Sequence, residues 1–254
     1  MRRAALLAGV GAVFVVAFAG VALAAVITCT GGRCEGTNGP DGITGTDQRD
    51  RIFALAGFDN VEARAGEDKL NGGNGGDNLF GEDGNDTYFG GRGEDVLSDS
   101  FGSTAASNDE MNGGPGRDFI EGTRGADILR GQEGGENEGS PELAGMFGDP
   151  GNDKLFGGPG EDGMEGEEGT DEHYGGKNND FIDAADQDVG DAPDLVDCGS
   201  GFDTALVLPN DRVRDNCEDV TDVSTTTVAP PTSGTTDEEQ QQQREAFLAE
   251  RGGG

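Results

Sequence analysis

Apolar and polar side chains recur along this 254-residue chain with a period of nine. Written in nonads from Gly36, the chain forms seven consecutive units that end at Ser98. The eighth position is always apolar or aromatic, at Ile43, Ile52, Val61, Leu70, Leu79, Tyr88 and Leu97. The sixth position is always aspartate, at Asp41, Asp50, Asp59, Asp68, Asp77, Asp86 and Asp95. A fixed period of this kind is typical of a repeat architecture.

The repeat resumes after two interruptions. Beyond a spacer at 99–103, four units cover 104–139 and carry at position six Asp109, Asp118, Asp127 and a degenerate Glu136. After a second spacer at 140–147, four units cover 148–183 and carry Asp153, Asp162, Asp171 and Asp180. Two weaker units over 189–206 carry Asp194 and Asp203. Polar residues take position eight only at Glu138 and His173, so the apolar pattern persists through most of the seventeen nonads.

The spacing predicts an all-β fold, a parallel β-roll (β-solenoid). Glycines in positions one to six suit a tight turn, and positions seven to nine suit a short strand whose eighth side chain points inward. Two nonads make one coil, so seventeen nonads predict about 8.5 coils and a rod of roughly 40 Å. Stacking then places Asp68 over Asp86 and Asp77 over Asp95, where like charges repel unless a cation lies between them.

Composition narrows the choice of ligand. Hydrophobic residues are 32% of the chain, glycines number 48, and the net charge is −34, values that a disordered acidic linker also shows. A linker, however, does not keep an apolar residue two positions after each aspartate. With only 17 Lys and Arg, the chain lacks the basic clusters that nucleic acid requires. The excess of carboxylates favours a hard cation instead.

The units GGNGGDNLF (72–80) and GGRGEDVLS (90–98) match G-G-x-G-x-D-x-U-x at every defined position. The chain therefore resembles the haemolysin-type (RTX) calcium-binding nonapeptide repeat proteins over about 150 residues. The resemblance implies several Ca²⁺ ions, each between two stacked turns, with Gly72, Asn74 and Asp77 sharing an ion with Gly91, Gly93 and Asp95. The remaining ligands that it implies are Asp41, Asp50, Asp59, Asp68, Asp86, Asp109, Asp118, Asp127, Asp153, Asp162, Asp171 and Asp180. Magnesium fits less well, because it prefers a tight octahedron and keeps its waters.

The N-terminal pattern predicts export. Arg2 and Arg3 precede an apolar run, and Ala22-Leu23-Ala24 forms an A-x-A site, so residues 1–24 are expected to be a signal peptide. An uncleaved membrane anchor and a lipoprotein modified at Cys29 are the alternatives. The protein is accordingly expected to be secreted and extracellular, or attached to the cell surface.

The ends of the repeat array carry the four cysteines. We expect an N-terminal cap at 25–35 with a Cys29–Cys34 disulfide, and a repeat-like C-terminal cap at 184–223 with a Cys198–Cys217 disulfide. A zinc site made of all four cysteines is the alternative. Residues 224–254 are expected to be a Ser/Thr/Pro linker and a disordered Gln-rich tail.

Catalytic chemistry finds little support in the sequence. His173 is the only histidine, which excludes H-E-x-x-H, and a polysaccharide cleft would be expected to carry aromatic platforms. We therefore predict a non-enzymatic calcium-binding protein with a structural, adhesive or envelope-associated role, whose partners are calcium and a cell-envelope or extracellular polymer. The alternative is an extracellular enzyme that acts on polysaccharide or another polymer from a β-solenoid scaffold.

Overall fold

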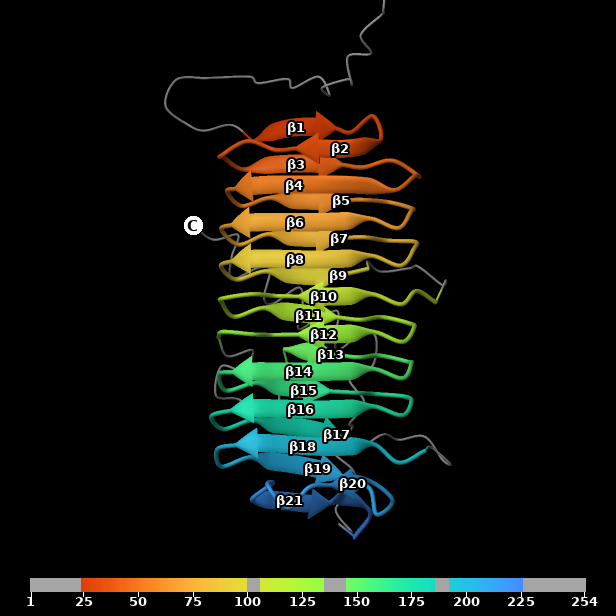
Figure 1. The fold of residues 1–254 in the computed structure, drawn as a ribbon, viewed down its shortest axis with the longest axis vertical. Coiled ribbons are helices and arrows are strands. Elements are labelled where there is room, and N and C mark those ends of the chain that lie inside the picture. Colours follow the sequence, from red (N-terminus) through yellow and green to blue (C-terminus); the bar gives the residue numbers. More distant parts are fainter. Residues whose placement is uncertain (1–23, 100–105, 135–144, 186–191, 226–254) are drawn as a thin grey trace, which may run out of the picture.

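The computed structural model describes residues 24–99, 106–134, 145–185 and 192–225. The chain winds into stacked coils, and each coil gives one strand to each of two parallel sheets (Figure 1). Odd-numbered strands form an eleven-stranded sheet and even-numbered strands form a ten-stranded sheet. The predicted parallel β-roll is confirmed.

The strands of the eleven-stranded sheet are β1 (Ala25–Thr28), β3 (Asp41–Thr44), β5 (Asn60–Glu62), β7 (Asn78–Phe80), β9 (Val96–Ser98), β11 (Phe119–Glu121), β13 (Met146–Phe147), β15 (Gly163–Glu165), β17 (Phe181–Ala184), β19 (Thr204–Val207) and β21 (Asp219–Asp222). Those of the ten-stranded sheet are β2 (Gly32–Glu35), β4 (Asp50–Ala56), β6 (Lys69–Asn74), β8 (Thr87–Arg92), β10 (Glu110–Asn112), β12 (Ile128–Arg130), β14 (Lys154–Pro159), β16 (Glu172–Lys177), β18 (Leu195–Ser200) and β20 (Arg212–Val213). A 3-10 turn, η1 (Val223–Thr225), follows β21.

The position-eight side chains form the interior of the roll. Leu70 pairs with Tyr88 and Leu79 with Leu97, so residues eighteen apart stack directly. Every position-eight side chain in the described units is at most 1% exposed. Because strand side chains alternate, positions seven and nine point outward, and position one points inward again, as buried Ala54 and Ala63 show.

Both segments predicted as caps lie at the ends of the roll and contribute strands to it. At one end, β1 pairs with β3 and β2 pairs with β4. At the other end, β18 and β19 pair with β20 and β21. The roll is therefore longer than the seventeen nonads predicted.

One predicted unit is displaced. The nonad phase predicts a strand within 131–139 and a spacer at 140–147, yet the strand at this level is β13, with Ile120 beside Met146. The interior accounts for the difference, because Glu138 would bury a carboxylate at position eight whereas Met146 buries an apolar side chain. Glu136 and Glu138 lie outside the described residues.

The two predicted disulfides are confirmed. Cys29, just after β1, is bonded to Cys34 in β2, and Cys198 in β18 is bonded to Cys217. They join neighbouring segments at the two ends of the roll. The expected signal peptide, apart from Ala24, and the tail after Thr225 lie outside the described residues. Within the described ranges, no helix has the length and apolar character needed to cross a membrane.

Candidate metal centre

Two ladders of buried aspartates run along the roll, formed by the position-six residues of the repeat. Each aspartate lies at or just before the start of a strand and is at most 3% exposed. The even ladder, beside the ten-stranded sheet, contains Asp50, Asp68, Asp86, Asp109, Asp127, Asp153, Asp171 and Asp194. The odd ladder, beside the eleven-stranded sheet, contains Asp41, Asp59, Asp77, Asp95, Asp118, Asp162, Asp180 and Asp203.

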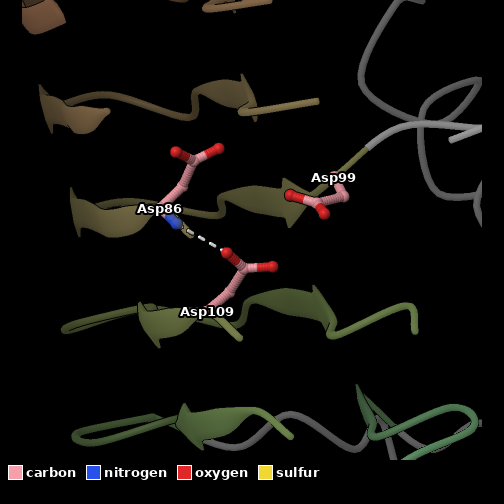
Figure 2. Close-up of side chains that lie close together, drawn as sticks. All are labelled: Asp86, Asp99 and Asp109. Carbon is pink, nitrogen blue, oxygen red and sulfur yellow. Dashed lines mark hydrogen bonds between the residues drawn. The ribbon is translucent and has the colours of Figure 1, made fainter. Parts of the chain in front are cut away.

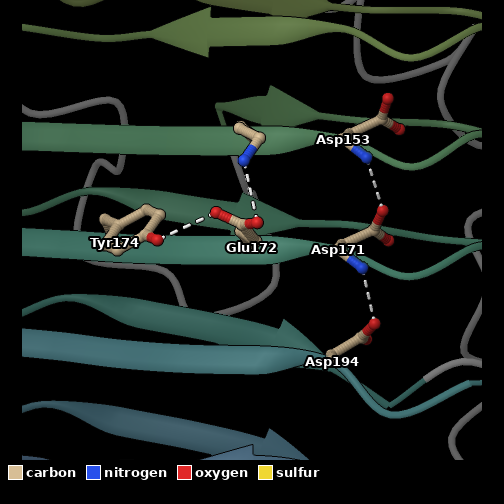
Figure 3. A network of polar contacts seen from close by, with 6 residues as sticks. Asp153, Asp171, Glu172, Tyr174 and Asp194 are labelled. Carbon is tan, nitrogen blue, oxygen red and sulfur yellow. Dashed lines mark hydrogen bonds and ion pairs between the residues drawn. The ribbon is translucent and has the colours of Figure 1, made fainter.

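One oxygen of most of these carboxylates connects successive coils. The backbone N–H of Asp68 donates to Asp86 Oδ1 at 2.7 Å, and that of Asp77 donates to Asp95 Oδ1 at 2.7 Å. The same bond joins Asp153 to Asp171 and Asp171 to Asp194, as Figure 3 shows. The expected stacking of Asp68 on Asp86 and of Asp77 on Asp95 is confirmed. These bonds orient the carboxylates without neutralising them.

The second oxygen, Oδ2, points into the turn. It is buried without a hydrogen-bond partner among the described residues in Asp59, Asp68, Asp86, Asp109, Asp127, Asp153, Asp180 and Asp203. Native proteins rarely leave a buried charged oxygen in this state, because the lost hydration is uncompensated. A repeated set of such oxygens therefore points to a cation.

Backbone carbonyls converge on the same places. A methyl group placed on Gly122 would lie 2.8 Å from both Asp127 Oδ2 and the Gly148 carbonyl oxygen. Gly148 repeats the arrangement one coil on, at 2.7 Å from both Asp153 Oδ2 and the Gly166 carbonyl oxygen. Carboxylate and carbonyl oxygens are the donors that Ca²⁺ takes. The residues present in these turns therefore fit calcium.

Burial also shifts the acidity of the ladder. Desolvation is the largest cause, and the neighbouring Asp77 adds repulsion, so the pKa of Asp59 rises to about 7. Desolvation likewise raises the pKa of Asp153 to about 8 and that of Asp127 to about 9. The folded state thus holds these side chains in their ionised form only at a cost, which a bound cation would remove.

The predicted shared ligand set is brought together in part. Asp77 and Asp95 are hydrogen-bonded, and Asp77 Oδ2 lies against Gly72. The register, however, pairs Gly91 with Gly73 rather than with Gly72, and the Asn74 carbonyl already accepts from Gly57 N–H at 2.9 Å. The roles of Gly72, Asn74, Gly91 and Gly93 as ligands remain a proposal.

Comparison with known proteins bears on these turns directly. The family model of the RTX calcium-binding nonapeptide repeat matches residues 35–70, 44–79, 62–97, 104–135 and 146–172. These segments of the chain are RTX calcium-binding nonapeptide repeats. Its RTX repeats thus coincide with most of the two aspartate ladders. No similar sequence was found among curated proteins.

Sequence reasoning missed three acidic residues of this RTX roll. Asp211 and Glu218 end the ladders, since they accept from the N–H groups of Asp194 and Asp203 at 3.1 Å. Asp99, assigned to a spacer, is fully buried beside Asp86 and Asp109 (Figure 2). The spacing of one coil could have revealed Asp99, because Asp99 follows Gly81 by eighteen residues. The nine-residue repeat, however, is interrupted after Ser98.

His173 occupies an interior position, as its place in the nonad predicted. It lies in β16 between Leu155 and Val196 of the neighbouring strands and is fully buried. Burial lowers the pKa of His173 to about 4, so its ring is neutral at neutral pH. His173 therefore takes the place of an apolar side chain in the interior of the roll.

Proposed function

We propose that this calcium-binding repeat protein is a secreted, non-enzymatic rod whose two aspartate ladders bind rows of Ca²⁺ ions. The observation that carries the proposal is the row of buried Oδ2 atoms, such as those of Asp59, Asp127 and Asp180, that have no hydrogen-bond partner in the described part of the chain. Their carboxylates serve the stacking of coils rather than a reactive centre. Calcium, when bound, supplies the positive charge that lets them lie one above another.

The ligands proposed from the sequence follow the ladders. The position-six aspartates would hold the ions, and backbone carbonyls of the glycine turns, including those near Gly72, Asn74, Gly91 and Gly93, would complete the coordination. Because each inner turn shares its aspartates with the next coil, loss of one ligand affects two levels. We expect equilibrium dialysis of the mature protein to find several Ca²⁺ ions per chain and little Mg²⁺. Binding of no more than one ion per chain would contradict the proposal.

Secretion is supported by the two disulfides, which persist in oxidising compartments, and by the A-x-A site at Ala22 to Ala24. Extracellular calcium would keep such sites filled. We expect the intact mass of protein recovered from culture medium to match a chain that begins at Ala25 and carries two disulfides. A lipid-modified Cys29 or free thiols would refute this part.

The outer face of the ten-stranded sheet supports an adhesive role. Arg51, Phe53, Lys69 and Phe89 line a hollow of about 370 Å³ on it. Further along, Phe156 and Tyr174 stack at 4.8 Å between ring centres. Flat rings beside the cationic Arg51 and Lys69 fit an anionic polymer of the cell envelope or matrix.

Cosedimentation with an insoluble anionic polysaccharide tests this face. We expect Lys69→Glu, in the hollow, to weaken binding in calcium, while Arg124→Glu, an exposed turn residue with the same change in charge, leaves it unchanged. Equal binding by both variants would remove this face from the proposal. Release of shortened polymer fragments by the purified protein would instead support the enzymatic alternative.

A further inference from the structure

Asp99 takes the place of position one in its coil, where the described nonads bear glycine, alanine or cysteine. It directly follows β9 and stacks on the turn of Gly81, since Glu82 N–H donates to the Asp99 carbonyl at 2.9 Å. In turns with glycine at position one, the missing side chain leaves room for a carboxylate oxygen of the ladder, as at Gly122. At this level a second carboxylate enters the same place.

Three carboxylates therefore meet inside the roll. Asp86, Asp99 and Asp109 each present an oxygen within 4.8 Å of the others, and none is more than 2% exposed. Figure 2 shows Asp99 entering from the end of β9 beside the Asp86–Asp109 pair, in which Asp86 N–H donates to Asp109 Oδ1 at 2.6 Å. Independently of this clustering, Oδ2 of Asp86 and Oδ2 of Asp109 are buried without a hydrogen-bond partner among the described residues.

Hydroxyl groups hold Asp99 in place. Its Oδ1 accepts from Tyr88 Oη at 2.5 Å, and its Oδ2 accepts from Ser107 Oγ at 2.6 Å and from Thr123 Oγ1 at 3.4 Å. Ionised carboxylate oxygens have further acceptor capacity beyond these bonds. The network explains the orientation of Asp99, while the Oδ2 atoms of Asp86 and Asp109 keep no hydrogen-bond partner among the residues that the structure describes.

We propose that Asp86, Asp99 and Asp109 form a divalent-cation site that differs from the repeat turns because Asp99 adds a third carboxylate. The inference rests on the proposed function, since two of the ligands belong to the even ladder. Calcium is the expected occupant, because all the donors are hard oxygens. Additional ligand charge raises calcium affinity, so this site is expected to bind about tenfold more tightly than the repeat turns.

Terbium luminescence can address this site selectively. The chain has two tyrosines and no tryptophan. Tyr88 bonds to Asp99, whereas Tyr174 lies on the outer face and bonds to Glu172 (Figure 3). In Tyr174→Phe protein, tyrosine-sensitised Tb³⁺ emission therefore reports an ion beside Tyr88. We expect this emission to appear with the first equivalent of Tb³⁺ and to be displaced by Ca²⁺.

Asp99→Asn in the same background removes the charge with little change in shape. We expect it to weaken the Tyr88-sensitised phase about tenfold. The matched control, Asp215→Asn at an exposed position outside both aspartate ladders, makes the same change in charge and should leave that phase intact. An Asp99→Asn titration identical to that of the parent would overturn the inference and leave a structural network only.

A second readout does not depend on a variant of Asp99. If Tyr88-sensitised emission in the Tyr174→Phe parent appears only after the other ions have bound, the site is not the tightest and the inference fails. Calcium-dependent folding without a tight Tyr88 signal would overturn this inference alone. Absence of any calcium or terbium binding would overturn the proposed function as well.

Discussion

At the residue scale, aspartate suits position six because one of its carboxylate oxygens accepts a hydrogen bond from the neighbouring coil and the other is left for a cation. Oδ1 reaches the backbone N–H of the preceding coil at 2.6–3.0 Å along the ladders, while Oδ2 turns inward. At the C-terminal end of the odd ladder, Glu218 takes this role and the ladder stops. The inner members should therefore matter more than the last ones.

A pair of substitutions checks this ranking. Asp77 bonds to both Asp59 and Asp95, so Asp77→Ala removes a ligand from two levels. Asp203 lies between Asp180 and the terminal Glu218. We expect Asp77→Ala to weaken calcium binding about tenfold or more in calorimetric titrations, and Asp203→Ala to have a smaller effect. Equal effects of the two substitutions would contradict the ranking.

The repeat positions could be predicted from the sequence because a fixed spacing marks them. Asp99 could not be predicted from the nine-residue phase, since the interruption after Ser98 ends it while stacking over eighteen residues continues past Gly81. The basic and aromatic face was also missed. Its rings stand at position nine of alternate units, as Phe53 and Phe89 do, and only the division into two sheets places them together.

At the element scale, the two sheets differ although the nonads are alike. Strand β6 spans six residues and continues into the glycine turn, whereas β7 spans three. The displaced strand β13 also follows side-chain packing, because the apolar Met146 is buried in the interior beside Ile120. The nine-residue spacing thus predicted where most strands begin, but the position of β13 depends on which side chain is buried.

The turns between strands give a second prediction. Gly75 has φ of 121°, and a methyl group there would overlap the carbonyl oxygen of Gly57 in the adjacent coil. We expect Gly75→Ala to lower the free energy of unfolding in saturating calcium by roughly 2 kcal/mol or more. Gly42→Ala, in β3 with no atom within 4 Å of the added methyl, should change it by about 0.5 kcal/mol or less. Urea unfolding of both variants measures this, and similar losses would contradict the proposed tight stacking of the turns.

At the scale of the whole molecule, the aspartate ladders make the metal-free roll sensitive to pH. Burial raises the pKa of Asp59 to about 7 and that of Asp127 to about 9, against an ordinary value of 3.8. Between the ordinary pKa of 3.8 and these raised values, the folded chain binds more protons than the unfolded chain. Stability is then fully present below about pH 4 and is lost as the pH rises through about 7 to 9.

In excess chelator we therefore expect more β structure at pH 5 than at pH 9, as measured by circular dichroism. His173 acts the other way below its ordinary pKa, because burial lowers it to about 4, but it is a single group against many aspartates. In saturating calcium this gain on acidification should disappear, since the cation replaces the protons. More β structure at pH 9 than at pH 5 in chelator would contradict the account.

The central claim is that folding and calcium binding are one event. Each nonad buries about one apolar side chain, which returns roughly 1.5–3 kcal/mol, while ordering each residue's backbone costs roughly 1–2 kcal/mol. Binding confined to the folded state supplies the missing stability.

The most direct measurement is a calcium titration of the mature protein at neutral pH, followed by circular dichroism. In chelator the spectrum should be that of a disordered chain. Calcium should produce a cooperative rise of β signal near roughly 10⁻⁴–10⁻³ M, and magnesium should not. An equally strong β spectrum in excess chelator, with a melting temperature that calcium does not change, would show that the metal does not hold this fold together.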